Sequence, residues 1–135
     1  MTVIQSVSIL GSTGSIGVNT LNVIEQNPER YRVFALSANT NVELLLQQCH
    51  QYQPDYAVMY DEGAAKKLAS ALSDSNTNVL SGIEGLKTIA SHEHADCVMA
   101  AIVGGIGLAP TFAAVEAGKR ILLANKESLV MAGDL

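Results

Sequence analysis

The sequence has few aromatic residues and few cations. It contains no tryptophan, and aromatic side chains make up only 4% of its 135 residues. Lys and Arg number 8 against 13 Asp and Glu, for a formal net charge of -5, and the cations are scattered along the chain. Binding to nucleic-acid phosphates or to an anionic membrane surface needs a basic face, so the sequence predicts neither kind of partner.

Cysteine is also scarce, and long apolar runs are missing. Cys49 and Cys97 lie far apart and form no CxxC pair, so we interpret both as buried thiols in a reducing compartment, with a disulfide or metal role as the alternative. The longest apolar run, residues 98–103, is too short to span a bilayer, and the N-terminus lacks the features of a signal peptide. The expected location is the cytoplasm.

Aliphatic residues dominate what is present. Hydrophobic residues make up 48% of the chain, which is enough to form the core of one domain, and the preference for Val, Ile, Leu and Ala suits a buried parallel sheet. Short apolar stretches alternate with segments of helical periodicity. The expected strands are residues 7–10, 31–36, 56–59, 79–80, 97–101 and 120–124. The expected helices are residues 16–26, 41–52, 62–72, 83–90 and 108–117. This alternation predicts an α/β fold, a doubly wound, Rossmann-like, mainly parallel sheet with helices on both faces.

A G-x-x-G-x-x-G stretch joins the first expected strand to the first expected helix. Gly11 would permit a tight turn, Gly14 would leave the main chain open to a pyrophosphate, and Gly17 would let the helix lie close to the strand. Main-chain N–H groups and the positive end of the helix dipole would then face the phosphates. The order of strand, turn and helix favours a dinucleotide-binding loop over a plain tight turn.

Three loops are expected to meet at one edge of the sheet. In a doubly wound sheet, ligands bind outside the carboxyl ends of the strands, where the strand order reverses. The loops at residues 11–17, 101–107 and 124–128 all follow expected strands. We therefore expect them to converge on the ligand.

The loop after the second expected strand contains no carboxylate. NAD-binding folds usually place an Asp or Glu here, about 20 residues after the glycine loop, to bind the adenosine ribose. Residues 37–41 instead read S-A-N-T-N. An acid would repel a 2′-phosphate, so its absence favours NADP, although the loop contains no Lys or Arg either.

Asn125, Lys126 and Glu127 follow the last expected strand. Lys126 is suited to bind a phosphate or an oxyanion, and Glu127 would offset its charge, but the same residues also suit an ordinary helix start. Beyond them we expect the beginning of a short helix and no returning strand. This ending favours a piece of a longer protein, with a short protein as the alternative.

The histidines and the remaining acids do not form a catalytic group. His92 and His94 flank Glu93 in a loop, and because no further ligand is nearby we expect solvated surface and not a metal site. Asp61 and Glu62 are typical of a helix N-terminus. No Ser-His-Asp or Cys-His arrangement can be assembled from the spacing. The residues alone therefore lead to a nucleotide-binding domain and no further.

Three stretches together carry a family resemblance. Residues 11–17 read GSTGSIG, residues 99–104 read MAAIVG and residues 122–128 read LLANKES. In this order and spacing, they closely resemble the N-terminal domain of the 1-deoxy-D-xylulose 5-phosphate reductoisomerase family, which acts in the methylerythritol phosphate route to isoprenoids. The resemblance implies that residues 1–135 form an NADPH-binding domain of a longer enzyme.

The reaction that the resemblance implies has two stages. A divalent metal (Mg²⁺, Mn²⁺ or Co²⁺) assists rearrangement of the phosphorylated sugar substrate, and NADPH then delivers hydride to the resulting aldehyde, giving 2-C-methyl-D-erythritol 4-phosphate. In the family, the metal ligands, most substrate-phosphate contacts and much of the homodimer interface come from the domain that follows. The chain itself is therefore expected to hold no catalytic residue or metal ligand and to be inactive alone.

The resemblance also assigns residue roles. The implied cofactor-binding residues are Thr13, Gly14, Ser15, Ile16, Asn41, Asn125 and Glu127. The first four would line the NADPH phosphates, the fifth would contact the adenosine end, and the last two would lie nearer the reaction centre. Lys126 would bind the substrate, and residues 101–104 would form an apolar wall along the cofactor.

Two adjacent positions depart from the family pattern. The family often has Gly and then Lys or Arg where this sequence has Asn39 and Thr40, so a cation that could hold the 2′-phosphate is missing. Arg32 lies at the opposite end of the expected strand and is not expected to reach.

Two other functions remain open on the sequence. Aspartate-semialdehyde dehydrogenases use a similar glycine loop and need a cysteine nucleophile, for which Cys97 or Cys49 would be the candidate. A non-catalytic nucleotide-sensing module would use the same fold without turnover.

Overall fold

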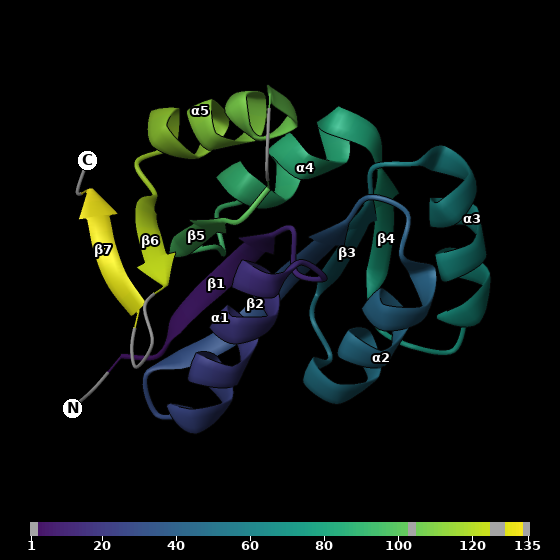
Figure 1. The fold of residues 1–135 in the computed structure, drawn as a ribbon, viewed down its shortest axis with the longest axis horizontal. Helices are drawn as coiled ribbons and strands as arrows, with labels where there is room; N and C mark the ends of the chain where they lie inside the picture. Colours follow the sequence, from purple (N-terminus) through teal and green to yellow (C-terminus); the bar gives the residue numbers. More distant parts are fainter. Residues whose placement is uncertain (1–2, 103–104, 125–128, 134–135) are drawn as a thin grey trace.

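The computed structural model describes residues 3–102, 105–124 and 129–133, which form one sheet with helices on both faces (Figure 1). The strand order is β4-β3-β2-β1-β5-β6-β7. The strands are β1 (Gln5–Leu10), β2 (Tyr31–Ala38), β3 (Tyr56–Met59), β4 (Asn78–Ser81), β5 (Cys97–Ala100), β6 (Arg120–Ala124) and β7 (Leu129–Gly133). Neighbouring strands from β4 to β6 are parallel, and β7 is antiparallel to β6. The predicted doubly wound, mainly parallel α/β fold is confirmed.

The helices between the strands cover the two faces unequally. They are α1 (Ser15–Gln26), α2 (Val42–Tyr52), α3 (Glu62–Ala71), α4 (Gly82–Ser91) and α5 (Leu108–Glu116), with a short 3₁₀ helix, η1 (Gly105–Gly107), before α5. Figure 1 shows α4 and α5 on one face of the sheet, opposite α1 and α2. The buried residues of α3 join those of α1 and α2 in one apolar cluster.

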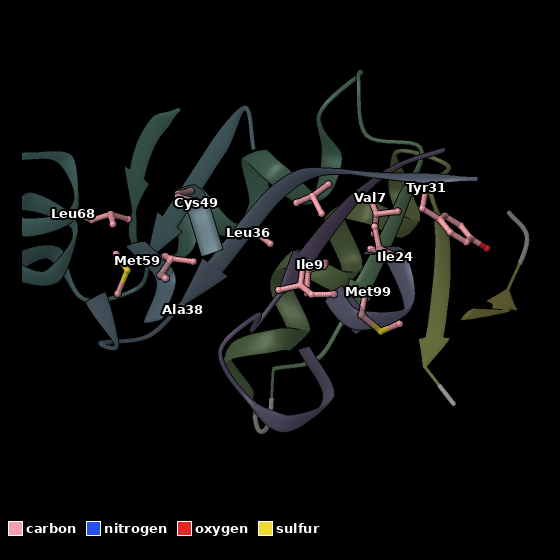
Figure 2. Close-up of a cluster of buried hydrophobic side chains, with 14 of the residues drawn as sticks. Val7, Ile9, Ile24, Tyr31, Leu36, Ala38, Cys49, Met59, Leu68 and Met99 are labelled. Carbon is pink, nitrogen blue, oxygen red and sulfur yellow. The ribbon is translucent and has the colours of Figure 1, made fainter. Parts of the chain in front are cut away.

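The two apolar clusters follow from the alternation of side chains along each strand. In β1, Val7 and Ile9 belong to the cluster under α1, α2 and α3, whereas Leu10 belongs to the cluster under α4 and α5. Figure 2 shows the first cluster, with Val7 and Ile9 among side chains from neighbouring strands and helices. Because both faces are covered, β1 to β3 consist largely of buried residues, as the aliphatic composition predicts.

Local chemistry sets the helix ends that the sequence predicts. Asn41 Oδ1 accepts a hydrogen bond from the Leu44 N–H at 3.1 Å at the start of α2. Asp61 Oδ2 accepts one from the Ala64 N–H at 2.8 Å at the start of α3. Gly118 follows α5 with φ of 76°, the left-handed conformation that glycine adopts most readily.

Two expectations about the elements are wrong. Strand β2 continues to Ala38, so Ser37 and Ala38 belong to the sheet and the loop begins at Asn39. The expected short helix with no returning strand is replaced by β7, which pairs with β6. An apolar run of five residues is too short to distinguish a strand from a helix by periodicity, and pairing to β6 decides the outcome.

The reversal of strand order lies between β1 and β5. The chain runs from β1 outward through β2 and β3 to β4, and then returns through α4 to place β5 on the other side of β1. Leu10, at the carboxyl end of β1, pairs with Ala100, at the carboxyl end of β5. A ligand crevice is therefore expected beyond these two residues.

Candidate nucleotide-binding site

A cavity of about 250 Å³ lies at the carboxyl ends of β1, β2, β3 and β5. Its lining residues come from several elements and are Gly11, Thr13, Gly14, Ser37, Ala38, Asn39, Tyr60, Leu86, Ala101, Ile102 and Ile106. Two of the three loops expected to converge, at residues 11–17 and 101–107, thus meet here. Residues 125–128 of the third loop lie outside the described part of the chain.

The three glycines of the loop have different surroundings. Gly11 has φ of 85°, and a Cβ there would lie 2.9 Å from the Ala101 carbonyl oxygen. A Cβ on Gly17 would overlap the Gly11 carbonyl oxygen and lie 2.6 Å from Ser12 Cα. On Gly14, by contrast, a Cβ would meet nothing closer than 3.9 Å. The fold itself requires glycine at the first and third positions, whereas the second faces open space that a ligand could occupy.

Helix α1 begins beside this open space. Gly14 is its N-cap residue and provides no side chain to cap the helix, whereas α2 and α3 are capped by Asn41 and Asp61. Ser15 and Ile16 in the first turn are exposed, and 50% of Ile16 is accessible. An uncapped helix N-terminus carries partial positive charge and main-chain N–H donors, which suit an anionic group.

A buried polar cluster holds the glycine loop by hydrogen bonds to Gly11 and Ser12. Sequence reasoning missed this cluster. The Ser12 N–H donates to the Ser37 carbonyl oxygen at 2.7 Å, and the Gly11 N–H donates to Ser37 Oγ at 2.8 Å. Ser12 Oγ donates to Gln48 Oε1 at 2.6 Å, and Gln48 Nε2 donates to the Ser12 carbonyl oxygen at 2.9 Å. Ser12, Ser37 and Gln48 are all buried. We call these three residues the loop anchor.

The end of the cavity at β2 and β3 is polar but uncharged. Asn39 and Tyr60 line it, and none of the described lining residues is a Lys, Arg, Asp or Glu. Arg32 lies at the start of β2, where its guanidinium pairs with Asp55 at 3.2 Å, so the expectation that it lies far from this end is confirmed. Asn41 caps α2 just beyond Asn39.

The residues expected nearer the reaction centre cannot be placed. Asn125, Lys126 and Glu127 lie outside the described residues, as do two of the four residues, 103 and 104, expected to form an apolar wall. The other two, Ala101 and Ile102, do line the cavity.

The histidines are placed partly as expected. His94 is exposed, but His92 is half-buried, with its ring 4.9 Å from the Phe34 ring and 5.3 Å from the Tyr56 ring, centroid to centroid. The expectation of solvated surface is therefore wrong for His92, because aromatic packing against β2 and β3 covers it. Among the described residues, no group of three or more His, Cys, Asp or Glu side chains could hold a metal ion.

Both cysteines are free and buried, which confirms their interpretation as buried thiols. Burial raises the pKa of the Cys49 thiol to about 12 and that of Cys97 to about 11. Cys97 also begins β5, at the opposite end of that strand from the cavity, and its Sγ donates to Gln5 Oε1 at 3.0 Å. Neither thiol has the low pKa of a cysteine nucleophile, which argues against the semialdehyde-dehydrogenase alternative.

The comparison with protein families decides the assignment. Residues 7–133 match the sequence model of the family described as 1-deoxy-D-xylulose 5-phosphate reductoisomerase. The chain belongs to this family. The resemblance carried by the three motifs is thereby confirmed, and the semialdehyde-dehydrogenase alternative is wrong.

Relatives in the reductoisomerase family match this chain along nearly its whole length. The 1-deoxy-D-xylulose 5-phosphate reductoisomerase of Methylobacillus flagellatus is 58% identical over 135 residues, which is 100% of this chain and 34% of the relative. That of Shewanella woodyi is 58% identical over 132 residues, covering 97% of this chain and 33% of the relative. The chain thus spans about a third of the length of these reductoisomerases.

Solved reductoisomerase structures share the fold. A crystal structure of DOX-P reductoisomerase in complex with NADPH, fosmidomycin and magnesium has a TM-score of 0.86 and 48% identity, covering 93% of this chain and 31% of that chain. The Zymomonas mobilis enzyme in complex with NADPH has a TM-score of 0.84 and 42% identity, covering 93% of this chain and 33% of that chain. No helix within the described residues is long and apolar enough to cross a membrane.

Proposed function

We propose that residues 1–135 form the NADPH-binding domain of a 1-deoxy-D-xylulose 5-phosphate reductoisomerase. The observation that carries this proposal is the open, uncapped N-terminus of α1 at Gly14, which adjoins a cavity at the point where the strand order reverses. Two solved members of the family that match this chain are complexes with NADPH.

The residues present fit a dinucleotide. Thr13, Gly14, Ser15 and Ile16 would hold the phosphates through main-chain N–H groups, because no side chain fills the space above Gly14. Asn39 and Tyr60, which line the cavity, would face the adenosine end together with Asn41, which does not line it, and Ala101 and Ile102 would exclude water along one side. The bound NADPH would supply the hydride.

In the complete enzyme, we propose that this domain serves the conversion of 1-deoxy-D-xylulose 5-phosphate to 2-C-methyl-D-erythritol 4-phosphate. Lys126 would bind the phosphorylated substrate, and Asn125 and Glu127 would contact the cofactor nearer the reaction centre. The divalent metal would be held by residues outside this chain. We further propose that the complete enzyme is a homodimer and that it is located in the cytoplasm. Two unpaired, buried thiols suit the reducing conditions of that compartment.

Calorimetric titration of the 135-residue protein with NADPH and, separately, with NADH tests the proposal. We expect binding with a preference for NADPH, because no described residue lining the cavity is an acid that would repel a 2′-phosphate. Equal affinities would show that Asn39 and Thr40 do not select the cofactor. Absence of binding to either nucleotide would contradict the proposed domain function.

A further inference from the structure

Gln48 lies on α2, outside the glycine loop, yet its side chain reaches the loop. Only 5% of this residue is accessible, and Ser12, which it contacts, is fully buried. The amide of Gln48 accepts a hydrogen bond from the Ser12 hydroxyl and donates one to the Ser12 carbonyl oxygen, at 2.6 and 2.9 Å. This reciprocal pairing uses both the donor and the acceptor of the amide.

The pairing joins α2 to a loop that β2 also holds. The Ser12 N–H donates to the Ser37 carbonyl oxygen at 2.7 Å, and the Ser12 hydroxyl, whose single proton is donated to Gln48, lies 3.2 Å from the same carbonyl oxygen. Thr13 and Gly14, the next two residues, line the cavity. The loop anchor therefore fixes the main chain immediately before the residues that would bind the phosphates.

Burying an amide is unfavourable unless hydrogen bonds replace those lost with water. Among the described residues, Ser12 is the only partner of the Gln48 side chain, and Gln48 does not line the cavity. A loop that is held in its bound conformation loses less conformational freedom when a ligand binds, so its affinity is higher.

We propose that Gln48 is a positioning residue for the phosphate-binding loop, and that it raises affinity for the pyrophosphate of NADPH without touching the cofactor. This inference rests on the proposed NADPH-binding function. It assigns a role in cofactor binding to a helix residue that lies outside the G-x-x-G-x-x-G motif.

Three variants of the 135-residue protein test the two hydrogen bonds between Gln48 and Ser12. Gln48→Met keeps a similar volume and removes both bonds. Ser12→Ala removes the hydroxyl, with its contacts to Gln48 and to the Ser37 carbonyl oxygen, but keeps the bond from Gln48 Nε2 to the Ser12 carbonyl oxygen. Gln48→Glu keeps an acceptor for the Ser12 hydroxyl but places a carboxylate against the Ser12 carbonyl oxygen. We expect Gln48→Met to raise the NADPH Kd about tenfold. Ser12→Ala should cause a smaller increase, whereas Gln48→Glu should cause an increase at least as large as that of Gln48→Met, because its buried carboxylate would face the Ser12 carbonyl oxygen. Gln47→Met is the matched control, because Gln47 is exposed on the same helix, and its Kd should not change.

A second ligand distinguishes positioning of the phosphate-binding loop from general support of the fold. Adenosine 2′-monophosphate contains the adenosine end of NADPH but no pyrophosphate, and its binding can be followed by ligand-observed NMR. We expect its Kd to be the same in Gln48→Met as in the wild type. An equal loss of affinity for both ligands would overturn the proposal, since it would show a general structural role.

The remaining outcomes are also decisive. If Gln48→Met does not fold, Ser12→Ala carries the test. Unchanged NADPH affinity in the folded variants would overturn the role of Gln48 while leaving the proposed function intact. Failure of the wild-type protein to bind NADPH would instead overturn the proposed function, and with it this inference.

Discussion

At the scale of single residues, Gly14 and Gly17 have separable roles. A Cβ at position 17 would overlap the main chain of Gly11 and Ser12, which cannot move aside as a flexible side chain could, whereas position 14 is open. We expect Gly17→Ala to lower the free energy of unfolding by about 3 kcal/mol or more. Gly14→Ala should cost about 1 kcal/mol or less, yet should raise the NADPH Kd at least about tenfold.

Urea denaturation and calorimetric titration check this pair of variants. The control is Gly63→Ala on α3, because Gly63 does not line the cavity. The added Cβ would meet only a carboxylate oxygen of the Asp61 side chain, at 3.3 Å. A stable Gly17→Ala protein would contradict the close approach of α1 to the loop. Normal NADPH binding by Gly14→Ala would contradict the placement of the phosphates.

The two thiols should be unreactive in the native protein. Burial raises the pKa of Cys49 from 9.0 to about 12 and that of Cys97 to about 11. A raised pKa keeps the thiol protonated, so at pH 8 the thiolate fraction falls about a thousandfold for Cys49 and about a hundredfold for Cys97.

Reaction with Ellman's reagent measures this reactivity. The native rate should be slow at pH 8 and rise with pH through the range from 9 to 12, while the urea-unfolded protein should react at the rate of ordinary thiols. Single Cys49→Ser and Cys97→Ser variants assign the rates to each residue. A fast native reaction at pH 8 would contradict the burial.

At the scale of residues, the sequence predicts a role correctly where that role depends only on neighbouring residues in the chain. The roles of Gly11 and Gly17 depend on the turn between one strand and the next helix, so the motif predicts them. The loop anchor was missed because a glutamine on a helix has the appearance of a surface residue. Its burial depends on the distance between α2 and the glycine loop, which only the folded chain defines.

At the scale of elements, we expect substitutions at the start of α2 to change both the stability of the fold and the choice of cofactor. The Asn41 side chain caps this helix, next to the uncharged end of the cavity. Asn41→Ala should lower the free energy of unfolding by about 1 kcal/mol because the cap is lost. Asn41→Asp should keep the cap but weaken NADPH binding more than NADH binding, because its charge would repel a 2′-phosphate.

Thermal unfolding and paired titrations with the two nucleotides measure these effects. Asp61→Ala, which removes the equivalent cap of α3, is the reference for a lost cap. If Asn41→Asp weakened NADPH and NADH binding equally, the adenosine 2′-phosphate would not lie near this residue.

Most elements were predictable because each short apolar strand is followed by a helix of clear periodicity and a local stop signal. Two features were not. Ser37 has the composition of a loop, but its backbone pairs in β2 and its hydroxyl binds Gly11, so tertiary contacts extend the strand. Strand β7 is a short apolar run that fits either a helix or a strand, and its pairing with β6 is the deciding interaction.

At the scale of the whole molecule, we expect NADPH binding without catalytic turnover. The chain contains the candidate cofactor site but spans about a third of its relatives, and its described residues hold no group of three metal-ligating side chains. We expect the 135-residue protein to bind NADPH and gain about 2.7 kcal/mol of stability when NADPH is present at a hundred times its Kd. We expect it not to oxidise NADPH.

Differential scanning fluorimetry with and without NADPH measures the stabilisation. Absorbance at 340 nm, with substrate and Mg²⁺ or Mn²⁺, measures oxidation, and a complete reductoisomerase serves as the positive control. Metal-dependent oxidation of NADPH by the 135-residue protein would show that the catalytic residues lie within it.

The pairing of β1 with β5 also bears on the order in which the chain folds. β1 pairs with β2 across a short stretch of sequence, whereas Val7 pairs with Cys97, 90 residues away, so closing the second contact costs more chain entropy. The candidate cavity lies beyond this pair of strands, which we expect to close late in folding. In refolding experiments, recovery of NADPH binding should therefore lag behind recovery of helical circular dichroism, so that cofactor binding reports the completed fold and not a partly assembled sheet.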